Sequence, residues 1–220
     1  MTADLPVHRA ALLDAARRLD DAGLNVNASG NLSVRVGPHV LVTPSGIPPA
    51  VMAEADMVLL DADGEVVEGD RTPTSEWRLH AALMAARPEV GAIVHTHSPE
   101  ATAAATLRAA VPAVHYVAAR FGGRGGLACA DYATYGSAEL AGNVAAALGG
   151  DRTACLMANH GAVAVAGGLD AALALALDVE WFCGVHRRAR ALGDPVALDD
   201  EEIARVATRF AAYGQPVHSR

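Results

Sequence analysis

Two histidines separated by one residue, His95 and His97, end a run of apolar residues at positions 92–94. In a β-strand, residues i and i+2 point to the same face. Both imidazoles could therefore reach one metal ion while Thr96 turns away from it. Neutral imidazole is a common metal ligand, but two such histidines can also be satisfied surface or core side chains. The pair alone leaves both interpretations open.

A third imidazole would favour the metal site, and His160 is the best candidate. It lies in "MANHGAVAV", at the end of an expected strand, and Gly161 directly after it permits a sharp turn and a close approach to the backbone. Three imidazoles form an open zinc site whose fourth position is left for water, a carboxylate or substrate. The other histidines have no comparable setting and are predicted to be structural or solvated: His8, His39, His80, His115, His186 and His218.

Three short polar segments could bind an anion. "TPTSEW" places Thr74 and Ser75 at the start of an expected helix, where free backbone N–H groups attract anions, although this segment taken alone favours ordinary helix capping. Glu76 either favours the helix dipole or acts as a general base beside a metal. The glycine-bearing loops at 27–33 ("NASGNLS") and 43–46 ("TPSG") are either parts of an anion cradle or plain turns.

The chain contains no lysine: all seventeen basic residues are arginine. Schiff-base catalysis by lysine, a pyridoxal-phosphate lysine and a P-loop lysine are therefore excluded. An enzyme of this composition that stabilises a carbanion next to a carbonyl needs another electron sink. A metal ion is the obvious substitute.

Composition narrows the class of protein further. The net charge of −8 and the aromatic content of 4% argue against a nucleic-acid partner, which would need a basic surface and stacking platforms. The N-terminus lacks an apolar signal core, and the most apolar stretch, 169–184, is interrupted by three acidic residues. We therefore expect no membrane association and a cytoplasmic location. The three cysteines form no CxxC motif, which indicates buried, inert thiols.

The elements that must position these residues are mingled helices and strands with several hairpins, rather than a regular alternation of strand and helix. The apolar fraction of 52% is enough for a sizeable core, and we expect a single domain over residues 1–220. Hydrophobic periodicity and cap residues predict helices over 4–23, 72–88, 98–109, 137–150, 169–193 and 199–214. Strands are expected over 31–36, 39–44, 57–61, 61–69, 91–97 and twice within 153–168, with 110–118 extended. The pattern predicts a mixed α/β sheet covered by helices on both faces.

These motifs together resemble the class II, zinc-dependent aldolases of the fuculose-phosphate aldolase type, a family that also contains ribulose-phosphate 4-epimerases and methylthioribulose-phosphate dehydratases. The combination of a glutamate at a helix start, HxH about twenty residues later and a distant HG is specific to this family. The resemblance covers nearly the whole chain and is carried by "SGNLSVR", "VTPSGIP", "TSEWRLHAALMAARPEVGAIVHTH", "PAVHY", "CADYATYG", "NHGAVA" and "DEEIARVATRFAAYG".

The resemblance implies a fold, an assembly and a reaction. The fold would be a three-layer α/β/α sandwich with a large, mostly antiparallel sheet. The assembly would be a homotetramer with active sites at subunit interfaces. The reaction would be the reversible cleavage of a ketose 1-phosphate, such as fuculose 1-phosphate or a related pentulose or deoxypentulose 1-phosphate, to dihydroxyacetone phosphate and a short aldehyde such as lactaldehyde.

The resemblance also implies residue roles. One Zn²⁺ per subunit would be held by His95, His97 and His160, with Glu76 as the acid/base and as a further ligand when no substrate is bound. Tyr116 and Tyr213 would come from a neighbouring subunit and act near the aldehyde. The substrate phosphate would lie among six small or polar residues: Gly30, Asn31, Ser45, Gly46, Thr74 and Ser75.

Four departures from the family pattern concern the substrate. Two serines before the glutamate are replaced by Thr74–Ser75, which keeps both hydroxyls. A threonine of the first glycine-rich loop is Ala28, which removes one hydrogen bond to phosphate. A phenylalanine of the family pattern is Tyr135 here, and "RFGGRGG" at 120–126 also differs.

Three functions other than an aldolase remain open. The first is a sugar-phosphate 4-epimerase, for which no second acidic residue is found around 111–119. The others are a methylthioribulose-phosphate dehydratase and a non-catalytic adducin-like scaffold.

Overall fold

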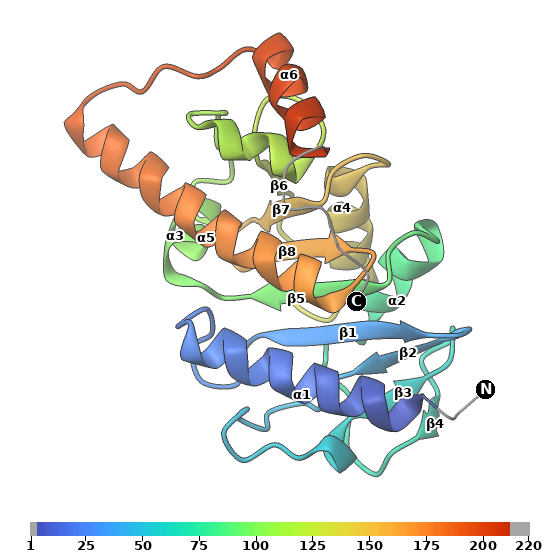
Figure 1. The fold of residues 1–220 in the computed structure, drawn as a ribbon. Coiled ribbons are helices and arrows are strands. Elements are labelled where there is room, and N and C mark those ends of the chain that lie inside the picture. The colour runs from blue at the N-terminus through green and yellow to red at the C-terminus, as the bar shows by residue number, and fades with distance from the viewer. Residues whose placement is uncertain (1–3, 212–220) are drawn as a thin grey trace, which may run out of the picture.

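The computed structural model describes residues 4–211, which form helices around one eight-stranded sheet (Figure 1). The strand order is β4-β3-β2-β1-β5-β8-β7-β6. The strands are β1 (Asn31–Val36), β2 (His39–Val42), β3 (Val58–Leu60), β4 (Val66–Glu68), β5 (Ala92–Thr96), β6 (Ala128–Ala130), β7 (Ala154–Met157) and β8 (Gly161–Ala166). The helices are α1 (Leu5–Asp21), α2 (Trp77–Ala86), α3 (Pro99–Ala105), α4 (Ala138–Leu148), α5 (Leu169–Leu192) and α6 (Asp200–Ala211), with 3₁₀ turns η1 (Glu54–Asp56) and η2 (Tyr116–Phe121).

The sheet is mostly antiparallel. Among the described strands, β6 and β7 pair in parallel, and every other neighbouring pair is antiparallel. Hairpins β1–β2, β3–β4 and β7–β8 supply three of the six antiparallel pairs, because short polar or glycine-bearing turns join consecutive strands. The strands expected over 31–36, 39–44, 57–61, 61–69 and within 153–168 are thereby confirmed.

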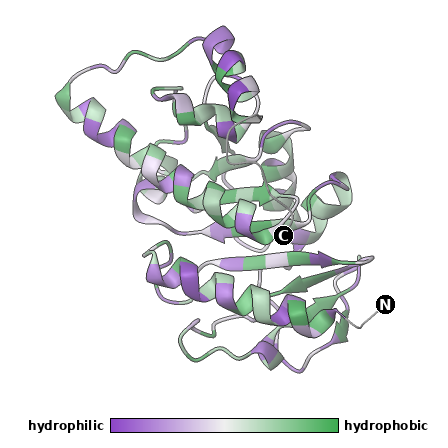
Figure 2. Ribbon diagram, viewed as in Figure 1, coloured by the Kyte–Doolittle hydropathy of each residue, from purple (hydrophilic) through white to green (hydrophobic). Residues whose placement is uncertain are grey.

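Helices cover both faces of the sheet and enclose two separate cores. Alternate strand residues point to opposite faces. Thus Ala92 and Val94 of β5 pack with α1, α3 and α5, whereas Ile93 packs with α2 and α4. In Figure 1, α1 and α5 cross in front of the strands, and Figure 2 shows the apolar residues concentrated on the strands. The expected three-layer α/β/α architecture is confirmed.

A carboxylate from α5 holds the start of α3. Glu180 accepts hydrogen bonds through Oε1 from the backbone N of Glu100 and through Oε2 from the backbone N of Ala101, both at 2.9 Å. Ser98, at the N-cap position, makes no side-chain cap. Two of the N–H groups that every helix start leaves unpaired are therefore satisfied by a residue eighty positions away.

Replacing Glu180 with alanine is expected to lower the free energy of unfolding by about 2 kcal/mol, because two partly buried N–H groups lose a charged acceptor. Urea denaturation followed by far-UV circular dichroism measures the loss. Glu180→Gln keeps one acceptor oxygen and should lose less. Equal unfolding midpoints for the wild-type protein and Glu180→Ala would show that water replaces the carboxylate without cost.

The segment at 110–118 differs from the prediction. Val111 forms an isolated bridge with Leu127, but the chain then enters the 3₁₀ turn η2 at Tyr116. His115 caps this turn, because its Nδ1 accepts a hydrogen bond from the backbone N of Val117 at 3.2 Å. A local cap has therefore overridden the strand preference of the valines.

Two smaller sequence-based expectations concern the cysteines and the membrane. Cys155 and Cys183 are buried free thiols, and burial raises the pKa of each to about 12, whereas Cys129 is half-buried. Between residues 4 and 211, no helix has both the length and the apolar character needed to cross a bilayer.

Candidate active site

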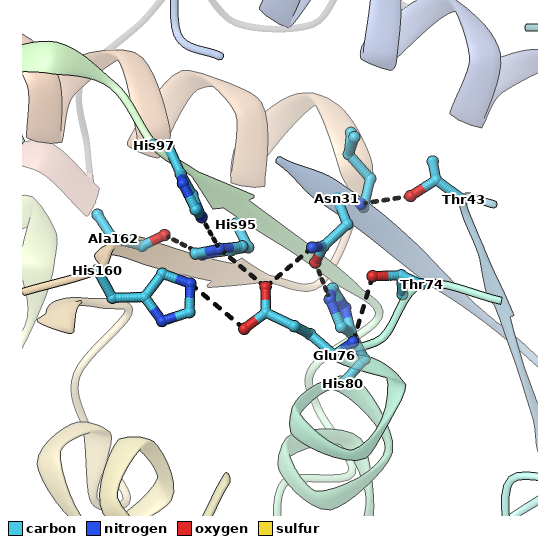
Figure 3. Close-up of polar contacts among 10 residues, drawn as sticks. Asn31, Thr43, Thr74, Glu76, His80, His95, His97, His160 and Ala162 are labelled. Atoms are coloured by element: carbon cyan, nitrogen blue, oxygen red, sulfur yellow. Dashed lines mark hydrogen bonds and ion pairs between the residues drawn. The ribbon is translucent and has the colours of Figure 1, made fainter. Parts of the chain in front are cut away.

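Strand register brings the predicted ligands together at one end of the sheet. His95, the fourth residue of β5, pairs with Asn31 of β1 on one side and with Val163 of β8 on the other. His97 follows β5 by one residue, and His160 ends the tight turn between β7 and β8. Because β5 and β8 are antiparallel neighbours, the end of β5 lies beside the start of β8 (Figure 3).

Three imidazoles and one carboxylate converge on a common point. The Nε2 atoms of His95 and His97 are 2.9 Å apart, and Glu76 Oε2 lies 3.0 Å from His95 Nε2. Glu76 Oε1 lies 3.5 Å from His160 Nε2. One ligand atom from each of the four residues lies within 4.8 Å of every other. This set could hold a metal ion.

Hydrogen-bond accounting supports a cation at this point. His95 Nδ1 lies 2.9 Å from the carbonyl oxygen of Ala162, which can only accept, so Nδ1 carries the hydrogen. The neutral ring then has a lone pair on Nε2, and this lone pair faces the carboxylate of Glu76 and the Nε2 of His97. Glu76 Oε1 is also buried without a hydrogen-bond partner. Acceptors that face one another require a proton or a metal ion between them.

The electrostatics of the cluster favour neutral rings for His97 and His160 and an ionised carboxylate for Glu76, and they favour a proton on His95. Burial, followed by positive charge on His95, lowers the pKa of His97 and of His160 to about 4. Burial would raise the pKa of Glu76, but the interaction with His95 outweighs it and holds the pKa of Glu76 well below its usual range. Burial likewise opposes charge on His95, yet the Glu76 carboxylate raises the pKa of His95. A proton and a metal ion therefore compete for the same lone pair.

The start of α2 differs from the prediction and explains how Glu76 reaches the cluster. The helix begins at Trp77, so Glu76 rather than Thr74 or Ser75 occupies the N-cap position. Its carboxylate makes no cap and turns to His95 instead, while Thr74 Oγ1 accepts from the backbone N of Glu76 at 3.3 Å. The Glu76 carboxylate therefore contacts the histidine cluster and makes no hydrogen bond to the helix end.

Gly161 sets the position of His160. A Cβ atom on residue 161 would lie 2.2 Å from the carbonyl oxygen of Thr96, a distance that backbone atoms cannot accommodate. The turn before it contains Asn159 in the left-handed region, with φ of 53°. Only glycine therefore allows β8 to begin this close to the end of β5, which places His160 beside His95.

A cleft of about 470 Å³ opens in front of the cluster. Glu76, His97 and His160 line it, while His95 is fully buried behind them. All six residues of the predicted phosphate site lie on its wall: Gly30, Asn31, Ser45, Gly46, Thr74 and Ser75. Tyr132, Tyr135 and Asn159 also face it. The cleft thus combines a metal-ligand cluster with a wall of small polar groups and an aromatic edge.

Of the two predicted tyrosines, the structure describes Tyr116, which is not part of this cleft within one chain. Tyr116 lies on η2, 52% exposed, with its ring 6.0 Å from that of Phe210, and it does not line the cleft. Tyr213 lies outside the described residues. The prediction that both come from a neighbouring subunit concerns an assembly that a single chain does not contain.

Sequence reasoning missed a second group of polar side chains behind Glu76. His80, assigned to the structural or solvated histidines, is fully buried and contacts Asn31 and Ser33. Two spacings could have indicated this group. Asn31 and Ser33 are two residues apart on a strand, and Glu76 and His80 are four apart on a helix, so each pair shares a face.

Comparisons with known proteins agree with this geometry. Residues 10–186 match the family model described as Class II Aldolase and Adducin N-terminal domain. The chain is 44% identical over 206 residues to the 5-methylthioribulose-1-phosphate/5-deoxyribulose-1-phosphate aldolase of Rhodospirillum rubrum, covering 94% of this chain and 92% of the relative. It is 41% identical over 204 residues to the L-fuculose phosphate aldolase of Escherichia coli K12, covering 92% and 94%.

A solved structure of an L-fuculose 1-phosphate aldolase superposes with a TM-score of 0.90 at 38% identity, covering 96% of this chain and 98% of the other. A structure named L-fuculose 1-phosphate aldolase from Glaciozyma antarctica superposes with a TM-score of 0.79 at 25% identity, covering 94% and 82%. The family model matches most of the chain, named relatives are up to 44% identical to it, and the fold is shared with a solved aldolase. The chain therefore belongs to the class II aldolase and adducin N-terminal domain family.

Proposed function

We propose that this protein is a lyase, a metal-dependent aldolase that reversibly cleaves a ketose 1-phosphate to dihydroxyacetone phosphate and a short aldehyde. The observation that carries the proposal is the convergence of three imidazoles and a buried carboxylate beside a wall of small polar groups in one cleft. The names of the relatives support it, because the Rhodospirillum rubrum relative and the solved structure with a TM-score of 0.90 are both named as aldolases of a ketose 1-phosphate. The absence of lysine also supports it, because a Schiff base cannot form.

We assign His95, His97, His160 and Glu76 as ligands of one Zn²⁺ per subunit. Three nitrogens and one oxygen match the ligand set of zinc sites that keep one position exchangeable. When bound, zinc would act as a Lewis acid that stabilises the negative charge left on the ketone fragment after the carbon–carbon bond breaks. Ala162 fixes the ring of His95 in the tautomer that presents Nε2.

The chain's own residues bind the phosphate and move the proton. The phosphate would lie among Gly30, Asn31, Ser45, Gly46, Thr74 and Ser75, near the N-terminus of α2, where backbone N–H groups favour an anion. Anchoring this remote group aligns the reacting carbons. Glu76, with its carboxylate ionised, would take or return the proton at the carbon of the phosphate-bearing fragment.

The proton on the aldehyde oxygen would come from another copy of the chain. Tyr116 is half exposed and lies away from its own cleft, as expected for a residue that serves a neighbour. Tyr213 is assigned to the same end of the substrate. These roles require active sites at subunit interfaces, and we propose that the assembly is a homotetramer.

The aldehyde that the enzyme releases can be identified by running the reaction in the direction of carbon–carbon bond formation. The protein is incubated with dihydroxyacetone phosphate and a panel of aldehydes, such as lactaldehyde, glycolaldehyde, acetaldehyde and methylthioacetaldehyde, and the adducts and their stereochemistry are determined by NMR. We expect a ketose 1-phosphate from at least one aldehyde. Isomerisation of a pentulose phosphate without cleavage would indicate an epimerase, and loss of water from methylthioribulose 1-phosphate would indicate a dehydratase. A metal-free protein that turns over no phosphorylated ketose would indicate a scaffold.

A further inference from the structure

Behind the cleft, three polar side chains form a buried chain of contacts that ends on Glu76. Ser33 and His80 are fully buried, Asn31 is 5% exposed and Glu76 is 4% exposed. Ser33 Oγ lies 2.6 Å from His80 Nδ1, and His80 Nε2 lies 2.6 Å from Asn31 Oδ1. Asn31 Nδ2 lies 3.0 Å from Glu76 Oε2 (Figure 3). Buried polar groups that are this fully paired define one arrangement of side chains.

The direction of each hydrogen bond follows from its acceptor. The ionised Glu76 carboxylate only accepts, so Asn31 presents its NH₂ group to Glu76 and its carbonyl oxygen to His80. His80 must then donate from Nε2, which leaves Nδ1 to accept from the Ser33 hydroxyl. Burial lowers the pKa of His80 to about 3, so the ring is neutral and has the one donor and one acceptor that this chain requires.

The backbone makes these contacts from two rigid elements. Asn31 and Ser33 lie on the same face of β1, and Asn31 pairs in register with His95. Glu76 and His80 lie one turn apart at the start of α2. Each element contributes one residue in contact with the cleft, Asn31 or Glu76, and one residue buried behind it, Ser33 or His80.

We propose that Ser33 and His80 are positioning residues that act through Asn31 to hold the Glu76 carboxylate in its catalytic orientation. The inference rests on the proposed role of Glu76 as the acid/base. Without a donor at His80, the Asn31 amide would lose the partner of its buried oxygen. The amide would then be fixed only through its bond to Glu76, and the carboxylate that accepts from Asn31 Nδ2 would be held less precisely against the reacting carbon.

The test compares His80→Phe with His80→Gln. Phenylalanine fills the space but neither donates nor accepts, whereas glutamine can donate to Asn31 and accept from Ser33. For His80→Phe we expect kcat to fall by about 10- to 100-fold, both for cleavage and for exchange of a hydroxymethyl hydrogen of dihydroxyacetone phosphate with solvent deuterium. The metal content per chain should change by less than about twofold, because the three imidazoles remain. KM should change less than kcat, because Asn31 is one of six residues in the phosphate wall. His80→Gln should recover most of the lost rate.

Ser33→Ala provides an independent variant if His80→Phe does not fold. It removes the hydroxyl that orients His80, and it should lower kcat by a smaller factor than His80→Phe does. The inference is overturned if the folded variants exchange deuterium at the wild-type rate, or if His80→Gln is as impaired as His80→Phe, since packing alone would then explain the loss. If the wild-type protein itself exchanges no hydrogen of dihydroxyacetone phosphate, the proposed function fails instead.

Discussion

Glu76→Gln is expected to retain the metal and to lower kcat by about 10²- to 10⁴-fold, the range that general acid–base catalysis contributes. Glutamine has the same shape as glutamate, and its oxygen can still accept from Asn31 Nδ2, but its amide cannot carry the proton. The three imidazoles of the metal site are unchanged. Steady-state cleavage of a ketose 1-phosphate and metal content by mass spectrometry measure the two quantities.

Glu139→Gln is the matched control for this prediction. Glu139 also lies in the first turn of a helix, α4, but it is exposed and does not line the cleft. It should leave kcat unchanged. A wild-type rate for Glu76→Gln would remove Glu76 from the proton-transfer step, whereas loss of the metal in this variant would show that the carboxylate is needed as a ligand.

Removal of the metal is expected to abolish cleavage, with a loss of more than about 100-fold, because several kcal/mol of charge stabilisation disappear. Dialysis against a chelator prepares the metal-free protein, and adding Zn²⁺ back should restore the activity. His97→Ala tests the ligand assignment in the same assay. It removes one of three imidazoles and should lower the bound metal from about one ion per chain.

His186→Ala is the control for the imidazole deletion. His186 is half-buried on α5 and lies outside the cleft. Its replacement should leave metal content and rate unchanged. An active His97→Ala protein with its metal content intact would refute the ligand assignment. Full activity after complete removal of all metal would refute the Lewis-acid role.

The sequence predicted most of the fold because its signals are local. Strands are specified by the alternation of apolar residues, as in 31–36 and 39–44. Hairpins are specified by turn residues such as Asp63–Gly64. The errors occurred where a tertiary or capping contact competes with propensity. His115 caps a 3₁₀ turn at Tyr116, within a segment predicted to be extended, and α2 begins at Trp77 because Glu76 bonds across the cleft rather than at the helix end.

By itself, the sequence determined which groups are available for chemistry: His95 and His97 on one strand face, His160 before a glycine, a glutamate at a helix start and no lysine. Only the tertiary structure decided how they are used. The antiparallel pairing of β5 with β1 and β8 brings residues 31, 95 and 160 together, and the packing of α2 against the sheet places Glu76 and His80 beside them. Such contacts join positions 45 to 67 residues apart, and their hydrogen-bond directions depend on burial, which no local spacing encodes.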